Sequence, residues 1–290
     1  MDTHSTLPVS TMQKVSQLPL IRLILGFLIV FLPVAVGQIF IMSLDLSRLG
    51  RSIAAVTFTI PIACGAYYIF VHFIERRQMT ELSPFGAVRE TVQGIVIGSL
   101  FFSSVIAILA MAGAYKVAGM NSLSVLLPPL FFGISAAVFE EILFRGVLFR
   151  GIERSLGSWM ALVISAAIFG GLHLMNKDAT IIGVIGIMLQ TGLTMGAAFM
   201  LTRRLWLPMG IHFAGNFTQG GIFGSVVSGN GAESGILRST FTGPDWLTGG
   251  AFGIEASLIT IALGLLVGIF LLWRAHKQGN IIRSRVEAGA

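Results

Sequence analysis

Apolar residues gather in long continuous runs along this chain, and short polar segments separate the runs. Each run has about the 20 residues that an α-helix needs to cross a hydrocarbon core of about 30 Å. We identify eight such runs, which cover residues 18–44, 53–74, 92–115, 125–149, 159–175, 181–202, 205–227 and 254–273. The pattern predicts an all-α fold, a polytopic membrane helix bundle of about eight transmembrane helices.

The amino-acid composition supports this interpretation. Of the 290 residues, 54% are hydrophobic and 11% are charged. Soluble domains carry about 25% charged residues, so this chain lacks the charge to cover a water-facing surface. The single cysteine, Cys64, excludes an intrachain disulfide and a paired-cysteine metal site. We therefore expect an integral multi-pass membrane protein.

The 19 Lys and Arg residues are unevenly divided between the two sides of an eight-helix arrangement. Fourteen of them, Arg145 included, fall on the side of both chain termini. The other five are Arg48, Arg51, Lys116, Lys177 and Arg238. Because cytoplasmic loops are enriched in basic residues, this division predicts that both termini are cytoplasmic. The net charge of +6 requires no nucleic-acid partner, since the sequence has no basic stripe with interleaved aromatic residues.

Three charged residues interrupt the apolar run 125–149. Glu140, Glu141 and Arg145 each cost about 2.5–3.5 kcal/mol at the centre of a membrane helix, so they are candidates for function. On a helix, Glu141 and Arg145 are four residues apart and can pair, whereas Glu140 points about 100° away from Glu141. The alternative is a structural ion pair near the interface, with Glu140 extended towards water.

Two later runs carry polar pairs at the same four-residue spacing. Phe169 and His173 share one helix face in the run 159–175, and His212 and Asn216 share another in the run 205–227. Each pair alone is compatible with a packed histidine or an interhelical hydrogen bond. Polar motifs on three runs are difficult to explain as three independent contacts, so we expect them to meet inside the bundle.

Together these groups can catalyse acyl transfer to water. Glu140 can remove a proton from water, His173 can share that proton, and His212 with Asn216 can donate hydrogen bonds to an oxyanion. A serine or cysteine nucleophile is not indicated, because the sequence has no GxSxG motif and Cys64 has no motif histidine nearby. Two histidines and one glutamate also form some catalytic zinc sites, which leaves Glu140, His173 and His212 as alternative Zn²⁺ ligands.

The ordered motifs resemble those of the CPBP family, which comprises type II CAAX prenyl endopeptidases, bacterial Abi proteins and proteins similar to lysostaphin resistance protein A. The resemblance covers about residues 123–227. It implies an intramembrane endopeptidase of the glutamate type, without a cofactor. It also implies that Glu140 activates water with the help of His173, and that His212 and Asn216 form the oxyanion site. The supporting residues would be Glu141, Arg145 and Phe169.

The chain is accordingly divided into five parts around one membrane domain. They are a cytoplasmic tail (1–17), N-terminal transmembrane helices (18–122), the protease-like catalytic core (123–227), a Gly-rich outer loop (228–253), and a last helix with a basic cytoplasmic tail (254–290). We expect a peptide or protein substrate in the membrane, either prenylated or a bacteriocin or pheromone precursor. A polytopic transporter and a non-catalytic membrane scaffold are the alternatives from other classes.

Straight helices would place two of the site residues at different depths. At 1.5 Å per residue, Glu140 lies about 25 Å from the outer end of its run, and His173 lies about 21 Å from the inner end of the next run. For these residues to meet, the helices must tilt or break. We therefore expect an irregular backbone around the site.

Overall fold

The computed structural model describes residues 18–230 and 235–284. It is 76% helical, which confirms the all-α fold class. Six of the described helices are long and apolar enough to cross a membrane: Pro19–Ser43, Arg48–Glu75, Ala87–Met111, Leu123–Met175, Ile181–Thr202 and Leu258–Lys277. The predicted count of eight spans stays a prediction.

The N-terminal third forms three long helices whose apolar runs were recognised from the sequence. They are α2 (Pro19–Ser43), α3 (Arg48–Ile69), which continues as the π-helix η1 (Phe70–Glu75), and α4 (Ala87–Met111). The Ser47 hydroxyl caps α3 by accepting a hydrogen bond from the backbone N–H of Gly50. Arg76 ends η1 in the left-handed conformation, with a φ of 53°.

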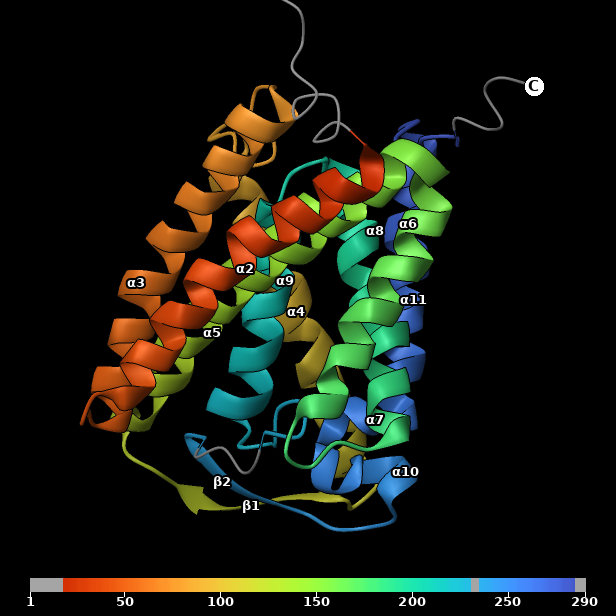
Figure 1. Cartoon of the computed structure of the whole chain (residues 1–290). Helices are drawn as coiled ribbons and strands as arrows, with labels where there is room; N and C mark the ends of the chain where they lie inside the picture. The colour runs from red at the N-terminus through yellow and green to blue at the C-terminus, as the bar shows by residue number, and fades with distance from the viewer. Residues whose placement is uncertain (1–17, 231–234, 285–290) are drawn as a thin grey trace, which may run out of the picture.

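The segment Leu123–Met175, of 53 residues, is one nearly continuous run of helix. Its elements are η2 (Leu123–Leu126), α5 (Leu127–Glu141), the π-helix η3 (Ile142–Phe149), α6 (Arg150–Leu172) and η4 (His173–Met175). Gly157 breaks this segment with a φ of 79°, a conformation that glycine adopts without steric cost. The chain turns there, so the predicted runs 125–149 and 159–175 lie on opposite sides of the break (Figure 1).

The remaining helices surround the end of that segment. They are α7 (Ile181–Gly186), η5 (Ile187–Gly192), α8 (Leu193–Thr202), α9 (Trp206–Asn216), η6 (Phe217–Ile222) and α11 (Leu258–Lys277). The connection between η6 and α11 was expected to be a Gly-rich loop. It contains a strand and short helices instead: β2 (Leu237–Phe241), α10 (Asp245–Thr248), η7 (Gly250–Phe252) and η8 (Ile254–Ala256).

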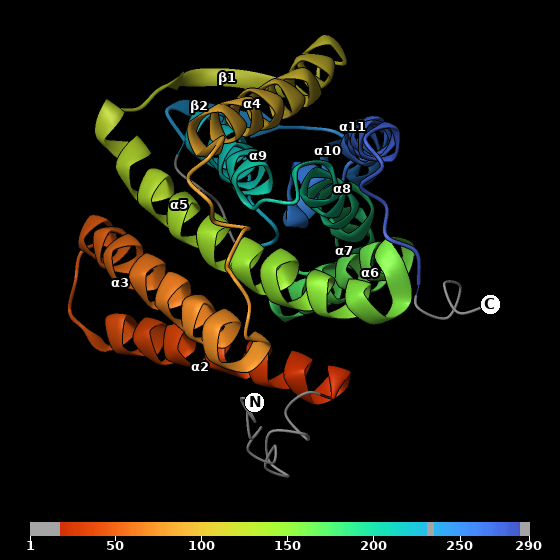
Figure 2. The ribbon, with the colours of Figure 1, turned by 90° about the horizontal axis from the view of Figure 1, so that it is seen from above.

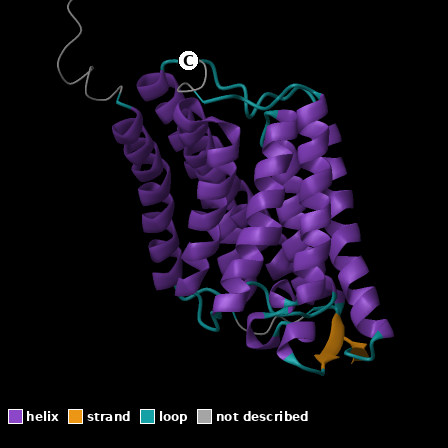
Figure 3. Cartoon of the chain, turned by 90° about the vertical axis from the view of Figure 1, so that its right-hand side faces the viewer, coloured by secondary structure: helices purple, strands orange, loops and turns teal. Residues whose placement is uncertain are grey.

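A two-stranded antiparallel sheet lies across one end of the bundle (Figure 3). Strand β2 pairs with β1 (Tyr115–Met120), from Tyr115 opposite Phe241 to Met120 opposite Leu237. We call this the strand end. The start of α2 and the end of α11 lie at the other end of the bundle, which we call the terminal end (Figure 1).

The bundle contains both tilted and upright helices. Seen from above, α8, α9 and α11 are viewed nearly along their axes, whereas α2, α3 and α5 extend across the view (Figure 2). Along a tilted α5, the 1.5 Å rise of each residue is only partly directed across the membrane. Straight helices would place Glu140 and His173 at different depths, so we expected an irregular backbone. The tilt of α5 and the break at Gly157 are that irregularity.

Buried ion pairs hold the terminal end together. The acidic residues Glu75, Glu81, Glu90 and Glu153 have side chains only 2–4% exposed, and each pairs with arginine. The arginines are Arg77, Arg150, Arg154, Arg203 and Arg204. The hydrogen bond to Glu90 raises the pKa of Arg204, so this guanidinium stays charged. Several of the basic residues on the side of the chain termini therefore stabilise the fold through ion pairs, in addition to any role in membrane orientation.

Helices α4 and α9 approach each other through glycine. A Cβ atom added to Gly94 would lie 2.5 Å from the carbonyl oxygen of Leu207, and one added to Gly98 would lie 2.5 Å from that of Ile211. On the other helix, a Cβ atom at Gly210 would lie 2.5 Å from the carbonyl oxygen of Thr91. Small residues at this spacing allow membrane helices to pack backbone against backbone. The contact fixes the position of α9, which carries His212 and Asn216.

Replacement of Gly94 by alanine tests this packing. Because the added methyl group would meet the backbone of α9, we expect Gly94→Ala to lower the free energy of unfolding by about 1–3 kcal/mol. Gly65→Ala is the matched control, since nothing lies within 4 Å of its added Cβ atom. Thermal unfolding in detergent measures both variants. Equal stability of the two would contradict the packing argument.

Candidate active site

The junction of α5 and η3 carries a fully buried ion pair. Glu141 and Arg145 are 0% exposed, and Arg145 Nη1 donates to Glu141 Oε1 across 3.0 Å, as the four-residue spacing predicts. Arg145 Nη2 also donates to the carbonyl oxygen of Gly192 across 3.2 Å. The division of basic residues between the two sides of the membrane assigned Arg145 to the cytoplasmic side. The structure corrects this, because Arg145 lies in the core.

Glu141 also contacts the third motif. Its Oε1 accepts a hydrogen bond from Nδ1 of His212 across 2.8 Å, although 71 residues separate the two. One carboxylate oxygen thus binds both a guanidinium and an imidazole, and the His212 side chain is only 6% exposed. A buried charge needs such partners. The expectation that the motifs meet inside the bundle is confirmed for α5 and α9.

The neighbouring Glu140 has a different environment. Its side chain is 31% exposed, and its Oε2 lies 3.8 Å from Nε2 of His212. This distance is too long for a direct hydrogen bond, and a bridging water is the usual way to connect such groups. The two adjacent glutamates therefore face opposite nitrogens of one imidazole ring, and only Glu140 is accessible.

Phe169 of α6 lies at the centre of the cluster. The Arg145 guanidinium lies 4.8 Å from the centre of its ring, in a cation–π contact. The His173 ring lies 5.0 Å away and the His212 ring lies 6.2 Å away. Phe169 therefore spaces the two histidines and brings the second motif into contact with the other two.

The position of His173 determines which of its nitrogens is available. Its Nδ1 lies 2.8 Å from the carbonyl oxygen of Phe169. A carbonyl can only accept a hydrogen bond, so Nδ1 is the donor, and Nε2 of the neutral ring keeps its lone pair. His173 is the first residue of η4, the short 3₁₀-helix that follows α6.

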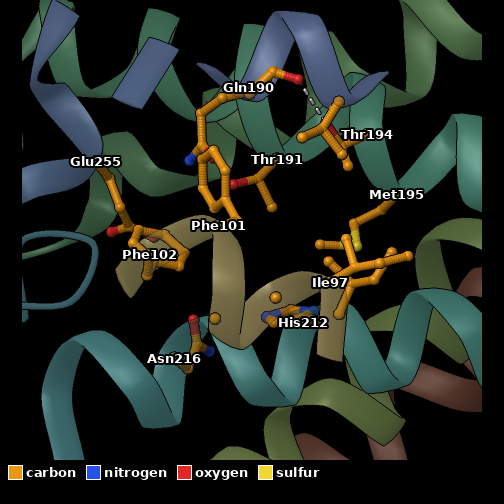
Figure 4. A pocket seen from close by; sticks show the side chains of 15 residues that line it. Ile97, Phe101, Phe102, Gln190, Thr191, Thr194, Met195, His212, Asn216 and Glu255 are labelled. Carbon is orange, nitrogen blue, oxygen red and sulfur yellow. Dashed lines mark hydrogen bonds between the residues drawn. The ribbon is translucent and has the colours of Figure 1, made fainter. Parts of the chain in front are cut away.

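Asn216 lies one helical turn beyond His212 and borders two cavities. The smaller cavity, of about 30 Å³, also borders His212 and lies among α4, η5, α8, α9 and α11 (Figure 4). It has room for about two water molecules. The larger cavity, of about 340 Å³, lies between the ends of α2 and α3 on one side and α5 and η6 on the other.

Glu255 is a buried polar residue whose position the sequence did not reveal. It is 3% exposed and borders the smaller cavity with His212 and Asn216. Its carboxylate accepts hydrogen bonds from Gln219 Nε2 at 3.0 Å and from the Ser228 hydroxyl at 2.9 Å. These hydrogen bonds hold the connection between η6 and α11 in place beside the smaller cavity. The only available signal was a carboxylate next to an apolar run.

The alternative zinc site requires three ligands close together. Within the described residues 18–230 and 235–284, no three His, Cys, Asp or Glu side chains are grouped to hold a metal ion. The set of Glu140, His173 and His212 does not fit a zinc centre in this geometry, and we derive no catalytic step from one. The roles of the site residues stay predictions.

Loss of Arg145 should destabilise the protein. In Arg145→Met, Glu141 would remain buried without its guanidinium partner, a change that costs about 3–5 kcal/mol of unfolding free energy. The double variant Glu141→Gln/Arg145→Met removes both charges and should recover part of that loss. Arg238→Met, at an exposed arginine, is the control. Thermal unfolding in detergent distinguishes them, and wild-type stability of Arg145→Met would refute the pair's role.

Comparison with known proteins supports the resemblance seen in the motifs. Residues 121–218 match the family model described as type II CAAX prenyl endopeptidase Rce1-like. No curated protein and no solved structure matches the chain. The matched segment contains Glu140, Glu141 and Arg145, as well as the motifs of α6 and α9. Residues 121–218 are thus similar to the Rce1-like type II CAAX prenyl endopeptidase family, the family that the motifs resemble, and this similarity suggests a protease of the membrane.

Proposed function

We propose that this protein is an intramembrane endopeptidase that hydrolyses a peptide bond with a water molecule activated by Glu140. The observation that carries the proposal is the position of two adjacent glutamates around one imidazole. Glu141 binds Nδ1 of His212 at 2.8 Å, and the accessible Glu140 faces Nε2 of the same ring at 3.8 Å. One carboxylate is thus committed to the structure, and the other is available for chemistry.

In the first step, Glu140 accepts a proton from a water molecule and the water oxygen attacks the carbonyl carbon of the substrate. His173 assists, because the lone pair on its Nε2 can accept a hydrogen bond from the same water. A new C–O bond forms, and the carbonyl oxygen becomes a negatively charged oxyanion.

His212 and Asn216 stabilise that oxyanion. With Nδ1 held by Glu141, a protonated His212 donates its second hydrogen bond from Nε2. The amide of Asn216, one turn along α9, supplies another donor. The proton held by Glu140 then passes to the amide nitrogen. The oxyanion re-forms the C=O bond as the C–N bond breaks, and the products are a carboxylic acid, which ionises in water, and an amine.

Arg145 and Phe169 position the groups that react. Arg145 neutralises Glu141 and is tied to Gly192 of η5, so the carboxylate cannot turn away from His212. Phe169 separates the two imidazoles and excludes bulk water from their edges. Both side chains act through the histidines, and neither needs to touch the substrate.

We also propose eight membrane passes with both termini in the cytoplasm of a bacterium. Gly157 divides the 53-residue segment Leu123–Met175 into two passes, and α9 with η6 supplies a pass of its own. An even number of passes agrees with the start of α2 and the end of α11 at one end of the bundle. Without the buried Arg145, the division of basic residues is thirteen to five, and it still favours this end as the cytoplasmic one.

Replacement of Glu140 tests the mechanism. Glu140→Gln keeps the size of the side chain but cannot accept the proton, so we expect peptide cleavage to fall at least 10²-fold, the usual contribution of a general base. Cleavage of a fluorogenic peptide library by the purified protein gives the rate, and thermal unfolding verifies the fold. Asp245→Asn makes the same chemical change at an exposed position and should keep wild-type activity.

The same comparison separates the alternative functions. A transporter or a scaffold would show no peptide cleavage in the wild-type protein. Wild-type cleavage by Glu140→Gln would instead assign the reaction to another group. The transporter is disfavoured already, because no inverted halves are apparent in the sequence.

Metal removal tests the zinc alternative on its own. Because the described histidines and glutamates are not grouped as ligands, we expect activity to survive exhaustive chelation. The measurement is the cleavage rate after dialysis against a strong chelator, together with the metal content of the active protein. Loss of activity that is reversed by Zn²⁺ would establish a metalloprotease.

A further inference from the structure

Gln190 is a buried polar residue to which the proposed mechanism gives no role. It belongs to η5, the π-helix between α7 and α8, and it is 3% exposed. Its Nε2 has no hydrogen-bond partner in the described part of the chain. Because a buried amide without a partner is costly, Gln190 indicates a polar occupant in the space beside it. Its place in a π-helix agrees with this, since π-helices are rare and are often found at functional sites.

The neighbouring helix α11 fixes the base of the Gln190 side chain. A Cβ atom added to Gly264 of α11 would lie 2.3 Å from the Cβ atom of Gln190. The two helices are therefore packed tightly at this point, and the amide end of Gln190 keeps more freedom than its base. The last torsion of a glutamine side chain is soft, so the amide can turn its N–H groups towards the cavity.

The cavity beside Gln190 is the smaller cavity of the candidate site. Gln190 and Thr191 enter it from η5, and His212 and Asn216 enter it from α9 on the opposite side (Figure 4). No hydrogen bond joins the side-chain amide of Gln190 or of Asn216 to another residue drawn there. With a volume of about 30 Å³, the cavity has room for about two water molecules. The two amides thus border one space that water can fill.

The lining supplies both donors and acceptors for water. The Gln190 amide and the Thr191 hydroxyl can donate hydrogen bonds, and the carboxylate of Glu255, which borders the same cavity, can accept them. Glu255 already accepts hydrogen bonds from two residues of the connection between η6 and α11, but a carboxylate has about four lone-pair sites. A buried water makes about three hydrogen bonds, and this lining provides that number.

These groups determine which end of the Asn216 amide faces the cavity. A water molecule that accepts from Gln190 and donates to Glu255 keeps its second O–H group for the amide oxygen of Asn216. In Figure 4 that oxygen is turned towards the side of Gln190 and Glu255, and the nitrogen is turned away from it. With its oxygen held by water, Asn216 has its Nδ2 donors left for the oxyanion.

From these observations we propose that Gln190 is a positioning residue of the protease. It holds water in the smaller cavity, and this water fixes the amide of Asn216 in the orientation that stabilises the oxyanion. The inference rests on the proposed protease function and adds a residue of η5 to its oxyanion site. Gln190 acts through Asn216 and does not touch the substrate.

Replacement of Gln190 by methionine tests this role, because methionine keeps the unbranched shape and lacks the amide. We expect kcat for peptide cleavage to fall about tenfold, less than the 10²–10³-fold effect of removing an oxyanion donor outright, with KM unchanged. Gln190→Asn keeps a donor and an acceptor and should recover most of that loss. Gln93→Met makes the same change at an exposed glutamine of α4 and should keep the wild-type values.

A double variant shows whether Gln190 acts through Asn216. Once Asn216→Ala has removed the oxyanion donor, the further change Gln190→Met should not slow cleavage any more. If the two effects instead multiply, the positioning role is wrong. Thermal unfolding in detergent accompanies each rate, and Gln190→Met should be at least as stable as the wild type because it buries no unpartnered amide. A lowered melting temperature with unchanged kcat would make Gln190 merely structural.

Magnetic resonance can detect the water without any activity. In protein with isotope-labelled glutamine and asparagine, reconstituted in lipid, magnetisation should pass from water to the Gln190 amide although this residue is 3% exposed. Gln190→Met identifies that signal by its loss, and it should also shift the amide signal of Asn216, which Asn216→Ala identifies. Absence of transfer from water, or an unchanged Asn216 signal, would overturn the proposal.

These measurements separate the two hypotheses. Transfer from water to Gln190 without any cleavage by the wild-type protein would reject the protease, and with it the catalytic role of Gln190, while keeping the water site. Cleavage by Gln190→Met at the wild-type rate would keep the protease and reject the positioning role.

Discussion

The structure of the candidate site depends on one carboxylate oxygen that is shared by two donors, one from the next helical turn and one from a distant part of the chain. Glu141 Oε1 binds Arg145 one turn away and His212 on another helix. A charge at this depth is tolerated only when its partners are in place, so the cluster ties the packing of α5, η5 and α9 to a single polar contact. This requirement explains why polar groups persist inside apolar runs, and it frees Glu140 for chemistry.

The sequence was sufficient to predict the fold class and the meeting of the motifs. Apolar runs follow from the thickness of a bilayer, and the pairing of Glu141 with Arg145 follows from helical spacing. It could not predict that His212 would bind Glu141, because tertiary packing decides which face of α9 meets α5. The spacing from His173 singled out Phe169, but it could not show that the Phe169 ring contacts Arg145 and His212.

Other features depended on local conformations that apolar periodicity does not encode. The turn at Gly157 requires a positive φ, but the chain has many glycines, and most of them lie in helices. The pairing of β1 with β2 joins segments more than a hundred residues apart, and neither segment alternates strictly between apolar and polar residues. Glu255 lies next to a membrane run, and only the folded connection shows that it is enclosed beside the site.

The glycine contact between α4 and α9 also sets the register of the reaction centre. A slip of α9 by one residue along α4 would shift its side chains by about 1.5 Å and rotate them by about 100°. His212 would then lose Glu141, and Asn216 would leave the space between the two cavities. At Gly210 the backbone of α9 packs directly against the carbonyl oxygen of Thr91 and the Cα atom of Gly94. A shift of α9 by a fraction of a residue would bring these backbone atoms into collision. The interface therefore fixes α9 in steps of one residue, and a slip should separate the proposed catalytic groups before the bundle itself unfolds.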